Sequence, residues 1–245
     1  MALVDASVKR CDLTVVSVFI NPLQFGPNED FDNYPRTLPA DTDKLEPAGA
    51  DLLFAPTAQE LFPPAAQTVK VTLPSLSRLL CGRNRPGHFD GVATVVAKLF
   101  NIVGSDYAFF GEKDWQQLTL IQSMVRYLSI PTAVIGVPTV RAPDGLALSS
   151  RNGYLSDAER ATAPTLYRTL CALRDAIQHG DRRYRVLERH GRDALADVGF
   201  EVDYVAVRDA MTLRTPQAES KRLRILAAAR FGKTRLIDNI DAGSA

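Results

Sequence analysis

The first part of the chain alternates short apolar runs with longer stretches of helical periodicity. The clearest run, Leu13–Ile20, is rich in β-branched residues and lacks polar alternation, which is typical of a strand buried on both faces of a parallel sheet. Further strands are predicted at Asp51–Ala55, Val69–Thr72, Tyr107–Phe110 and Thr132–Val137, and helices at Met1–Ala6, Asp41–Ala48, Gly91–Val103 and Asp114–Leu128. Strands that alternate with helices predict βαβ units and an α/β fold with a parallel sheet.

The pattern changes after Val137, and we place a domain boundary there, between residues 1–137 and 138–245. The sequence Ala-Pro-Asp-Gly at 142–145 predicts a turn between two short extended pieces. Ser156 and Glu159 match a capping box and begin a helix predicted to reach Gly180. A second helix ends near Gly199, and strands follow at Val202–Arg208, Arg222–Ala229 and Thr234–Asp238. The second domain is therefore expected to be a small α+β unit.

Composition narrows the class of protein without identifying it. The chain has 245 residues, 29 basic and 28 acidic side chains and a net charge of +1, so charge favours neither nucleic acid nor an anionic membrane as a partner. Its three cysteines are far apart and form no CxxC pair, which predicts neither a disulfide framework nor a zinc site. Without a signal peptide or a long apolar run, we expect a cytoplasmic protein.

The loop Gly111-Glu112-Lys113-Asp114 lies between a predicted buried strand and a helix. Ligands of open α/β sheets bind at the carboxyl ends of strands. Glycine allows close approach of the backbone, the following helix start offers free N–H groups, and Lys113 adds positive charge. This combination suits the phosphates and ribose of a nucleotide. An ordinary strand-to-helix turn, with Asp114 as its N-cap, explains the same residues.

Two further polar segments have the same two interpretations. Leu148-Ser149-Ser150-Arg151-Asn152 brings hydroxyls, a guanidinium and an amide into one loop, which suits a triphosphate or the polar end of a hairpin. Asn21-Pro22-Leu23-Gln24-Phe25 follows the first strand, and Gln117 lies one turn into the helix after Lys113. Neutral amides beside apolar rings suit a hydroxylated organic acid, although a capped turn is the simpler explanation.

Several common motifs are missing or incomplete. The three histidines have no metal-ligand spacing, and no GxSxG segment supports a serine hydrolase. Gly232-Lys233-Thr234 resembles the end of a Walker A loop but lacks its earlier glycine, and GxGxxG does not occur. The basic segment Arg85–Phe89 could close over phosphates, but a surface loop is the simpler interpretation.

Taken together, these segments resemble those of the pantothenate synthetases (pantoate–β-alanine ligases). The segments that carry the resemblance, in family order across essentially the whole chain, are Ser17–Phe25, Tyr34–Thr37, Arg85–Phe89, Phe110–Leu118, Asp144–Asn152 and Arg235–Asn239. The resemblance implies a Rossmann-like nucleotidyltransferase domain, a smaller α+β C-terminal lid domain and a homodimer. It also implies a reaction in which ATP and pantoate form pantoyl adenylate and pyrophosphate, and β-alanine then displaces AMP.

The resemblance also assigns roles to individual residues. Pantoate would be bound by Gln24 and Gln117, with Gln24 also serving β-alanine and Asn21 nearby. Lys113 would be catalytic. The ATP site would comprise Gly111, Glu112, Lys113, Asp114, Val140, Leu148, Ser149, Ser150 and Arg151. Mg²⁺ would accompany the triphosphate, with Asp41 as a candidate ligand.

One departure from the family pattern concerns the start of the chain. Family members have a strand and a turn with an HxGH motif directly before the helix that begins here at Met1, and both are absent from this sequence. The family places that strand between those at Leu13–Ile20 and Tyr107–Phe110. We therefore expect either a ligase whose recorded start is internal or a non-catalytic remnant. Another adenylyltransferase of the same fold is a third hypothesis, which the paired glutamines disfavour.

Overall fold

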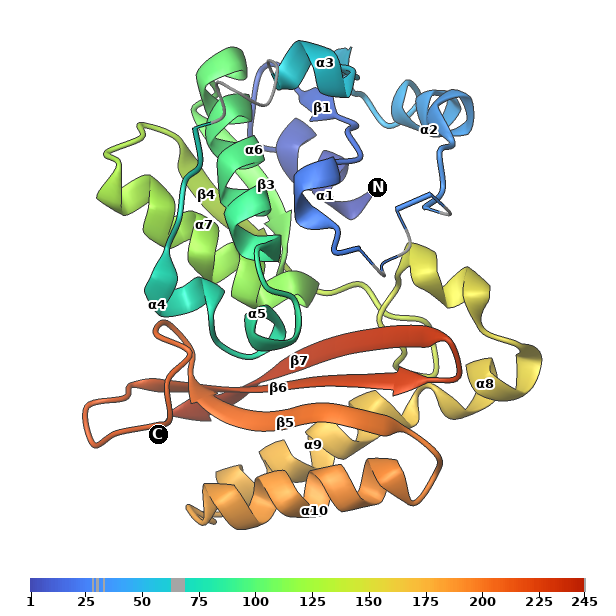
Figure 1. The fold of residues 1–245 in the computed structure, drawn as a ribbon, viewed down its shortest axis with the longest axis vertical. Coiled ribbons are helices and arrows are strands. Elements are labelled where there is room, and N and C mark those ends of the chain that lie inside the picture. The colour runs from blue at the N-terminus through green and yellow to red at the C-terminus, as the bar shows by residue number, and fades with distance from the viewer. Residues whose placement is uncertain (28, 30, 33, 63–68, 245) are drawn as a thin grey trace. The chain divides into compact units, whose positions relative to one another are not determined.

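The structure is a computed structural model that describes residues 1–27, 29, 31–32, 34–62 and 69–244. Contacts divide the chain into two compact units (Figure 1). Unit 1 comprises Met1–Glu112 and Gln116–Pro138, and unit 2 comprises Lys113–Trp115 and Thr139–Ala245. The tripeptide Lys113–Trp115 therefore packs with unit 2, although the residues on both sides of it belong to unit 1. The functional division at Val137 into a nucleotide-binding domain and a lid stays a prediction.

Unit 1 contains four strands that form two parallel pairs. β1 (Val15–Ser17) pairs with β2 (Leu52–Phe54), and β3 (Tyr107–Gly111) pairs with β4 (Ala133–Val137). The parallel pairing confirms the expected α/β class. β1 and β3 lie in different sheets, so within the described part of the chain each is paired along one side only.

Helices cover these strands in the places where the sequence predicts them. The first helix, α1 (Ala2–Val8), contacts β3 and β4. Phe100 of α6 (His88–Val103) meets Phe110 of β3 edge to face, with ring centroids 6.4 Å apart. Leu118 of α7 (Trp115–Tyr127) lies against Gly136 of β4. The remaining helices of this unit are α2 (Leu38–Leu45), α3 (Ala58–Leu61), α4 (Pro74–Ser77) and α5 (Cys81–Asn84). None of the described helices is both long and apolar enough to cross a bilayer.

Three predicted elements, two in unit 1 and one in unit 2, are wrong in detail. Val69–Thr72 is not a strand, because its Val71 N–H donates to the Thr94 hydroxyl of α6 instead of to a neighbouring strand. The first strand is only partly buried, with Ser17 exposed, since it has a partner on one side. The helix predicted from Ser156 to Gly180 is two helices, α8 (Asp157–Thr162) and α9 (Thr165–Gln178), because Pro164 has no N–H to continue the first one.

Unit 2 is a three-stranded antiparallel sheet with two helices on one face (Figure 1). The strands are β5 (Glu201–Asp209), β6 (Arg222–Phe231) and β7 (Thr234–Ser244), in that spatial order. Both α9 and α10 (Tyr184–Ala196) contact the sheet and each other. These elements match the predicted α+β pattern, and the capping box of Ser156 and Glu159 is present at the start of α8.

Alternation along the strands separates the two faces of this sheet. On the helix-covered face, Val205, Val207, Leu223, Ile225, Ala227 and Ala229 join the leucines of α9 and α10 in one core. On the opposite face, β6 presents Arg224, Leu226 and Ala228, which are also buried. Successive side chains of a strand point to opposite faces, so neighbouring residues of β6 and β7 contribute to different surroundings. This matters for the candidate site.

Candidate active site

In unit 1, the segment that follows β1 is a short 3₁₀ turn, η1 (Pro22–Gln24), packed on α6. Asn21 begins it and is only 2% exposed. Its Oδ1 accepts a hydrogen bond from the Leu23 N–H at 3.1 Å, and its Nδ2 donates to the carbonyl of Gly91 at 3.1 Å and to Gln24 Oε1 at 3.3 Å. The Asn21 amide is therefore used within the protein, where it sets the position of Gln24.

The segment Arg85–His88 holds the same turn from the other side. The Gln24 carbonyl lies 2.7 Å from His88 Nδ1, and since a carbonyl only accepts, that nitrogen carries the proton. Arg85 donates to Glu29 Oε1 at 2.5 Å and pairs with both oxygens of that carboxylate. Burial raises the pKa of the Glu29 carboxyl, but the hydrogen bond and charge of Arg85 outweigh it, so the pKa is lowered. The Arg85 charge is taken up by Glu29.

Two adjacent glutamines of α7 have different surroundings. The Gln116 amide is buried, donates from Nε2 to the Leu76 and Leu79 carbonyls at 2.9 and 2.8 Å, and accepts from the Cys81 N–H at 3.1 Å. These hydrogen bonds hold the segment that precedes Arg85 against α7. Gln117 is half-buried, and its amide has no hydrogen-bond partner among the residues that the structure describes. Gln117 therefore has donors and an acceptor to offer a ligand, and its role in pantoate binding stays a prediction.

The predicted nucleotide loop begins at the carboxyl end of β3. Gly111 ends the strand, and Glu112–Asp114 form a single 3₁₀ turn, η3, that leads directly into α7. Apart from Gly111 and its two chain neighbours, no described residue has an atom within 4 Å of where a Cβ would lie on Gly111, and the Glu112 side chain lies against Gly136. The Lys113 amine is 4.0 Å from Asp114 Oδ1, a loose pair that leaves the ammonium able to bind phosphate oxygens.

In unit 2, the residues predicted to bind the triphosphate follow a tight hairpin over 140–148. The Leu148 N–H donates to the Val140 carbonyl at 2.9 Å, and both side chains are exposed. Ser149 then caps the turn η4 (Ser150–Tyr154) by accepting from the Arg151 N–H at 3.3 Å. Thus the polar hairpin end, one of the two interpretations of this segment, is present. The exposed Ser150 and the start of η4 are still placed where a ligand could meet them.

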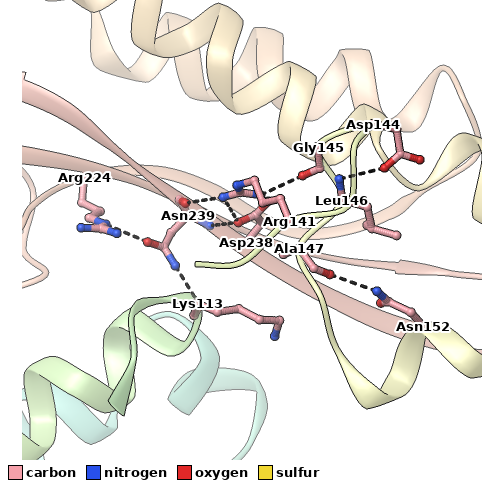
Figure 2. Close-up of polar contacts among 10 residues, drawn as sticks. All are labelled: Lys113, Arg141, Asp144, Gly145, Leu146, Ala147, Asn152, Arg224, Asp238 and Asn239. Carbon is pink, nitrogen blue, oxygen red and sulfur yellow. Dashed lines mark hydrogen bonds and ion pairs between the residues drawn. The ribbon is translucent and has the colours of Figure 1, made fainter. Parts of the chain in front are cut away.

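A polar network on β7 holds both of these segments (Figure 2). Asp238 accepts from Arg141 Nη1 at 2.6 Å and from Nη2 at 2.9 Å, and Arg141 also donates to the carbonyl of Gly145 in the hairpin at 3.0 Å. The Arg141 guanidinium stacks on Tyr167 of α9, 3.8 Å from the ring centroid. This bidentate pair, with Asp238 almost fully buried, fixes the hairpin that precedes Ser149.

The next residue of β7 holds the nucleotide loop. Asn239 Nδ2 donates to the Lys113 carbonyl at 2.8 Å, and Asn239 Oδ1 accepts from Arg224 Nε at 2.7 Å. Figure 2 shows Asn239 between Arg224 and the Lys113 backbone, with the Lys113 side chain running away from this contact. Arg224 stacks 3.5 Å from the centroid of the Trp115 ring, and the Trp115 indole N–H donates to the Ala210 carbonyl at 2.9 Å.

Sequence reasoning did not find this network. Asp238 and Asn239 occur in one of the segments that carry the family resemblance, but no role was assigned to them. Arg224 follows Lys221 and Arg222 closely in the sequence, which is typical of a solvated basic cluster, but it is only 5% exposed. The signal in the sequence was its place between Leu223 and Ile225 inside a predicted strand.

Comparison with known proteins places the chain in a family. The family model described as Pantoate-beta-alanine ligase matches residues 1–241. A pantothenate synthetase of Pseudomonas putida (strain W619) is 56% identical over 241 residues, which is 98% of this chain and 84% of that protein. Another, from Stutzerimonas stutzeri (strain A1501), is 57% identical over 242 residues, with the same shares covered. The chain belongs to the pantoate–β-alanine ligase family.

Solved structures of relatives agree with this assignment. A pantothenate synthetase from Thermus thermophilus has a TM-score of 0.93 at 47% identity, over 99% of this chain and 88% of that one. A pantoate-beta-alanine ligase from Francisella tularensis, solved in complex with beta-gamma ATP and β-alanine, has a TM-score of 0.78 at 31% identity. The match covers 98% of this chain and 84% of the Francisella tularensis chain. The predicted nucleotidyltransferase-type fold and ligase class are thus confirmed, while the roles of individual residues stay predictions.

The packing of the Asn21–Gln24 turn on α6 leads to a testable prediction about stability. A Cβ on Gly91 would lie 2.3 Å from the Leu23 carbonyl oxygen and 2.8 Å from the Gln24 nitrogen, and backbone cannot yield as a side-chain tip can. Gly91→Ala should lower the free energy of unfolding in urea by about 1–3 kcal/mol, as overpacking does. The control is Gly26→Ala, whose Cβ would lie no closer than 3.7 Å to any described residue beyond its chain neighbours. Equal stability of the two variants would show that this turn does not need the close approach.

Proposed function

We propose that this chain activates pantoate with ATP and joins it to β-alanine. In the first step a pantoate carboxylate oxygen attacks the α-phosphorus, and the bond to pyrophosphate breaks. In the second, the amine of β-alanine attacks the pantoyl carbonyl, loses a proton, and AMP leaves with the attacking oxygen. Family membership supports the overall ligation, and the relative solved with beta-gamma ATP and β-alanine supports ATP and β-alanine as ligands. The adenylate intermediate goes beyond these comparisons and is our proposal.

The main barrier in the first step is electrostatic. A carboxylate must approach a triphosphate, so the protein has to neutralise negative charge and align the reacting atoms. The observation that supports this most directly is the Lys113 amine, whose only ion-pair partner among the described residues is Asp114, 4.0 Å away. Its backbone, in contrast, is held at 2.8 Å by Asn239. A fixed loop that carries a loosely paired cation can stabilise developing charge without a protein nucleophile.

The other residues predicted to bind ATP can make the remaining contacts to the nucleotide. Gly111, Glu112 and Asp114 frame Lys113 along the chain, and Gly111 has open space beside it. Ser149, Ser150 and Arg151 offer hydroxyls, N–H groups and a guanidinium to phosphate oxygens, while the exposed Val140 and Leu148 offer apolar contact to the nucleoside.

Pantoate recognition falls to the neutral amides of unit 1. Gln24 is held through its carbonyl by His88 and through its Oε1 by Asn21, and Gln117 has no partner in the described part of the chain. We propose that Gln24 and Gln117 contact the hydroxyls and carboxylate of pantoate, that Gln24 also meets β-alanine, and that Asn21 acts by holding Gln24. Preorganised amides of this kind favour a small hydroxy acid, because every hydroxyl then finds a partner.

A magnesium ion would be held mainly by the phosphates of ATP. Mg²⁺ usually keeps several waters and takes one or two carboxylates together with substrate oxygens. The described residues contain no group of three or more potential ligands, which fits an ion that arrives with the nucleotide. Asp41, in the first turn of α2, is half-buried and accepts from the Thr37 hydroxyl at 3.0 Å, so its carboxylate can still bind a cation. When bound, the ion would neutralise charge on the phosphates. The homodimer and the cytoplasmic location stay predictions.

The proposed role of Lys113 can be tested by removing its amine. Lys113→Ala should lower the rate of ATP-dependent adenylate formation by about two to three orders of magnitude, the usual cost of losing one charge-stabilising donor. The measurement is pyrophosphate release in the presence of pantoate. Lys233→Ala, which removes an exposed lysine from the β6–β7 turn, is the matched control and should change nothing. A Lys113 variant within threefold of wild type would remove this residue from the mechanism.

The division of labour between the two substrates can be tested at Gln117. Gln117→Leu should weaken pantoate binding by about 1–3 kcal/mol, because substrate hydroxyls are left unpaired in the site, while ATP binding is nearly unchanged. Calorimetry with each ligand separately measures both effects. Gln122→Leu, on the exposed side of the same helix, is the control. Equal losses for pantoate and ATP would contradict the assignment of Gln117 to pantoate.

A further inference from the structure

The dipeptide Asp238–Asn239 lies where two predicted nucleotide-binding segments converge within unit 2. Because successive side chains of a strand point to opposite faces, Asp238 faces the helices and holds Arg141, whereas Asn239 faces away from them and holds the Lys113 backbone. One strand thus anchors both the hairpin ahead of Ser149 and the loop that carries Lys113. The hydrogen bond from Asn239 to the Lys113 backbone matters more for function, because Lys113 is the residue proposed to be catalytic.

The orientation of the Asn239 amide follows from its partners. Arginine has donors only, so the atom that faces Arg224 Nε at 2.7 Å must be the amide oxygen. The amide nitrogen then faces the Lys113 carbonyl at 2.8 Å, which can only accept. Arg224 in this way fixes the direction of the Asn239 side chain. The contact to Lys113 is built from two chemically unambiguous hydrogen bonds.

The tripeptide Lys113–Trp115 is held at both ends by the sheet. At one end Asn239 binds the Lys113 carbonyl, and at the other the Trp115 ring stacks under Arg224 and donates its N–H to the Ala210 carbonyl. These contacts close a ring that runs through Asn239, Arg224 and Trp115 back along the chain. They also explain why these three residues group with unit 2 although β3 and the rest of α7 do not. With its backbone fixed in this way, only the Lys113 side chain remains to be ordered when it binds a ligand.

Burying a cation solely to stabilise this fold would be inefficient. Arg224 is 5% exposed, and transfer of a charge from water costs several kcal/mol that a buried pair often fails to recover. Apolar side chains would fill the same position on the strand at no such cost. In some proteins buried polar groups select one geometry, and the contacts of Arg224 and Asn239 favour one geometry of the Lys113 loop.

We propose that Asn239 is a positioning residue for Lys113. It holds the Lys113 carbonyl so that the amine is presented to the phosphates of ATP, and Arg224 keeps the Asn239 amide in the required orientation. The inference rests on the proposed role of Lys113 in nucleotide binding. Asn239 itself is not proposed to touch the substrate.

A double-mutant cycle tests whether Asn239 acts through Lys113. The readout is the dissociation constant for ATP, measured by calorimetry on the 245-residue chain. Lys113→Ala should weaken ATP binding about tenfold or more, as expected for a charge-assisted hydrogen bond. Asn239→Ala should weaken it about tenfold as well. The double variant should bind within threefold of Lys113→Ala alone, since residues that act through one contact are not additive.

Emission from Trp115 gives a second readout that a general loss of stability would not change. It is the only tryptophan in the chain, so its fluorescence reports on the tripeptide directly. Asn239→Ala should alter this emission in the absence of ATP. The control is Thr132→Val, which deletes another buried side-chain bond to a carbonyl, that of Ser105, and should leave both the emission and the ATP affinity unchanged.

Two further variants keep the test decisive if Asn239→Ala does not fold. Asn239→Asp keeps the size of the side chain and an acceptor for Arg224 but removes the donor to Lys113. Arg224→Met keeps the aliphatic packing and releases the amide. Both should weaken ATP binding and alter Trp115 emission. If Lys113→Ala weakens binding but the folded Asn239 and Arg224 variants do not, or if the losses are additive, the positioning role is overturned and the proposed function is not. A wild-type chain that does not bind ATP, or a Lys113→Ala chain that binds normally, would overturn the proposed function and this inference with it.

Discussion

The alternation of side chains along β7 is the constraint on which the candidate nucleotide site of unit 2 depends. Two consecutive residues of one strand cannot share a face, so Asp238 and Asn239 serve two different segments. Asp238 fixes the 140–148 hairpin through Arg141, and Asn239 fixes the Lys113 backbone. A rigid strand places both segments more accurately than the loops could by themselves, and catalytic geometry is sensitive to small displacements.

The segment of unit 1 that we propose to bind pantoate follows a different physical rule, that of close backbone packing. Gly91 allows the Asn21–Gln24 turn to lie directly on α6, with the Leu23 carbonyl where a side chain would otherwise stand. Asn21 and His88 then fix the position of Gln24 by hydrogen bonds to its amide and carbonyl oxygens. Polar residues that the sequence marks as ligand-binding thus include some whose amides are already used inside the protein.

Much of the fold could be predicted from the sequence because its signals are local. Short apolar runs predicted the parallel strands, and the Ser156–Glu159 capping box predicted the start of α8. The failures arose where tertiary contacts override local preference: Val69–Thr72 looks like a strand, yet its Val71 N–H finds a partner in the Thr94 hydroxyl. For the site, motifs located the candidate segments. The links among Asn239, Arg224 and Lys113 join positions up to 126 residues apart, and no pattern along the chain encodes them.

The central claim is that pantoate is activated as an adenylate, and the fate of one oxygen atom tests it most directly. Pantoate labelled with heavy oxygen in its carboxylate can be incubated with ATP, β-alanine and the purified chain, and the products analysed by mass spectrometry. Because the attacking carboxylate oxygen stays on the α-phosphorus when the amine displaces AMP, the account predicts AMP that carries one heavy oxygen. Label in inorganic phosphate with release of ADP, or AMP that carries none, would contradict it.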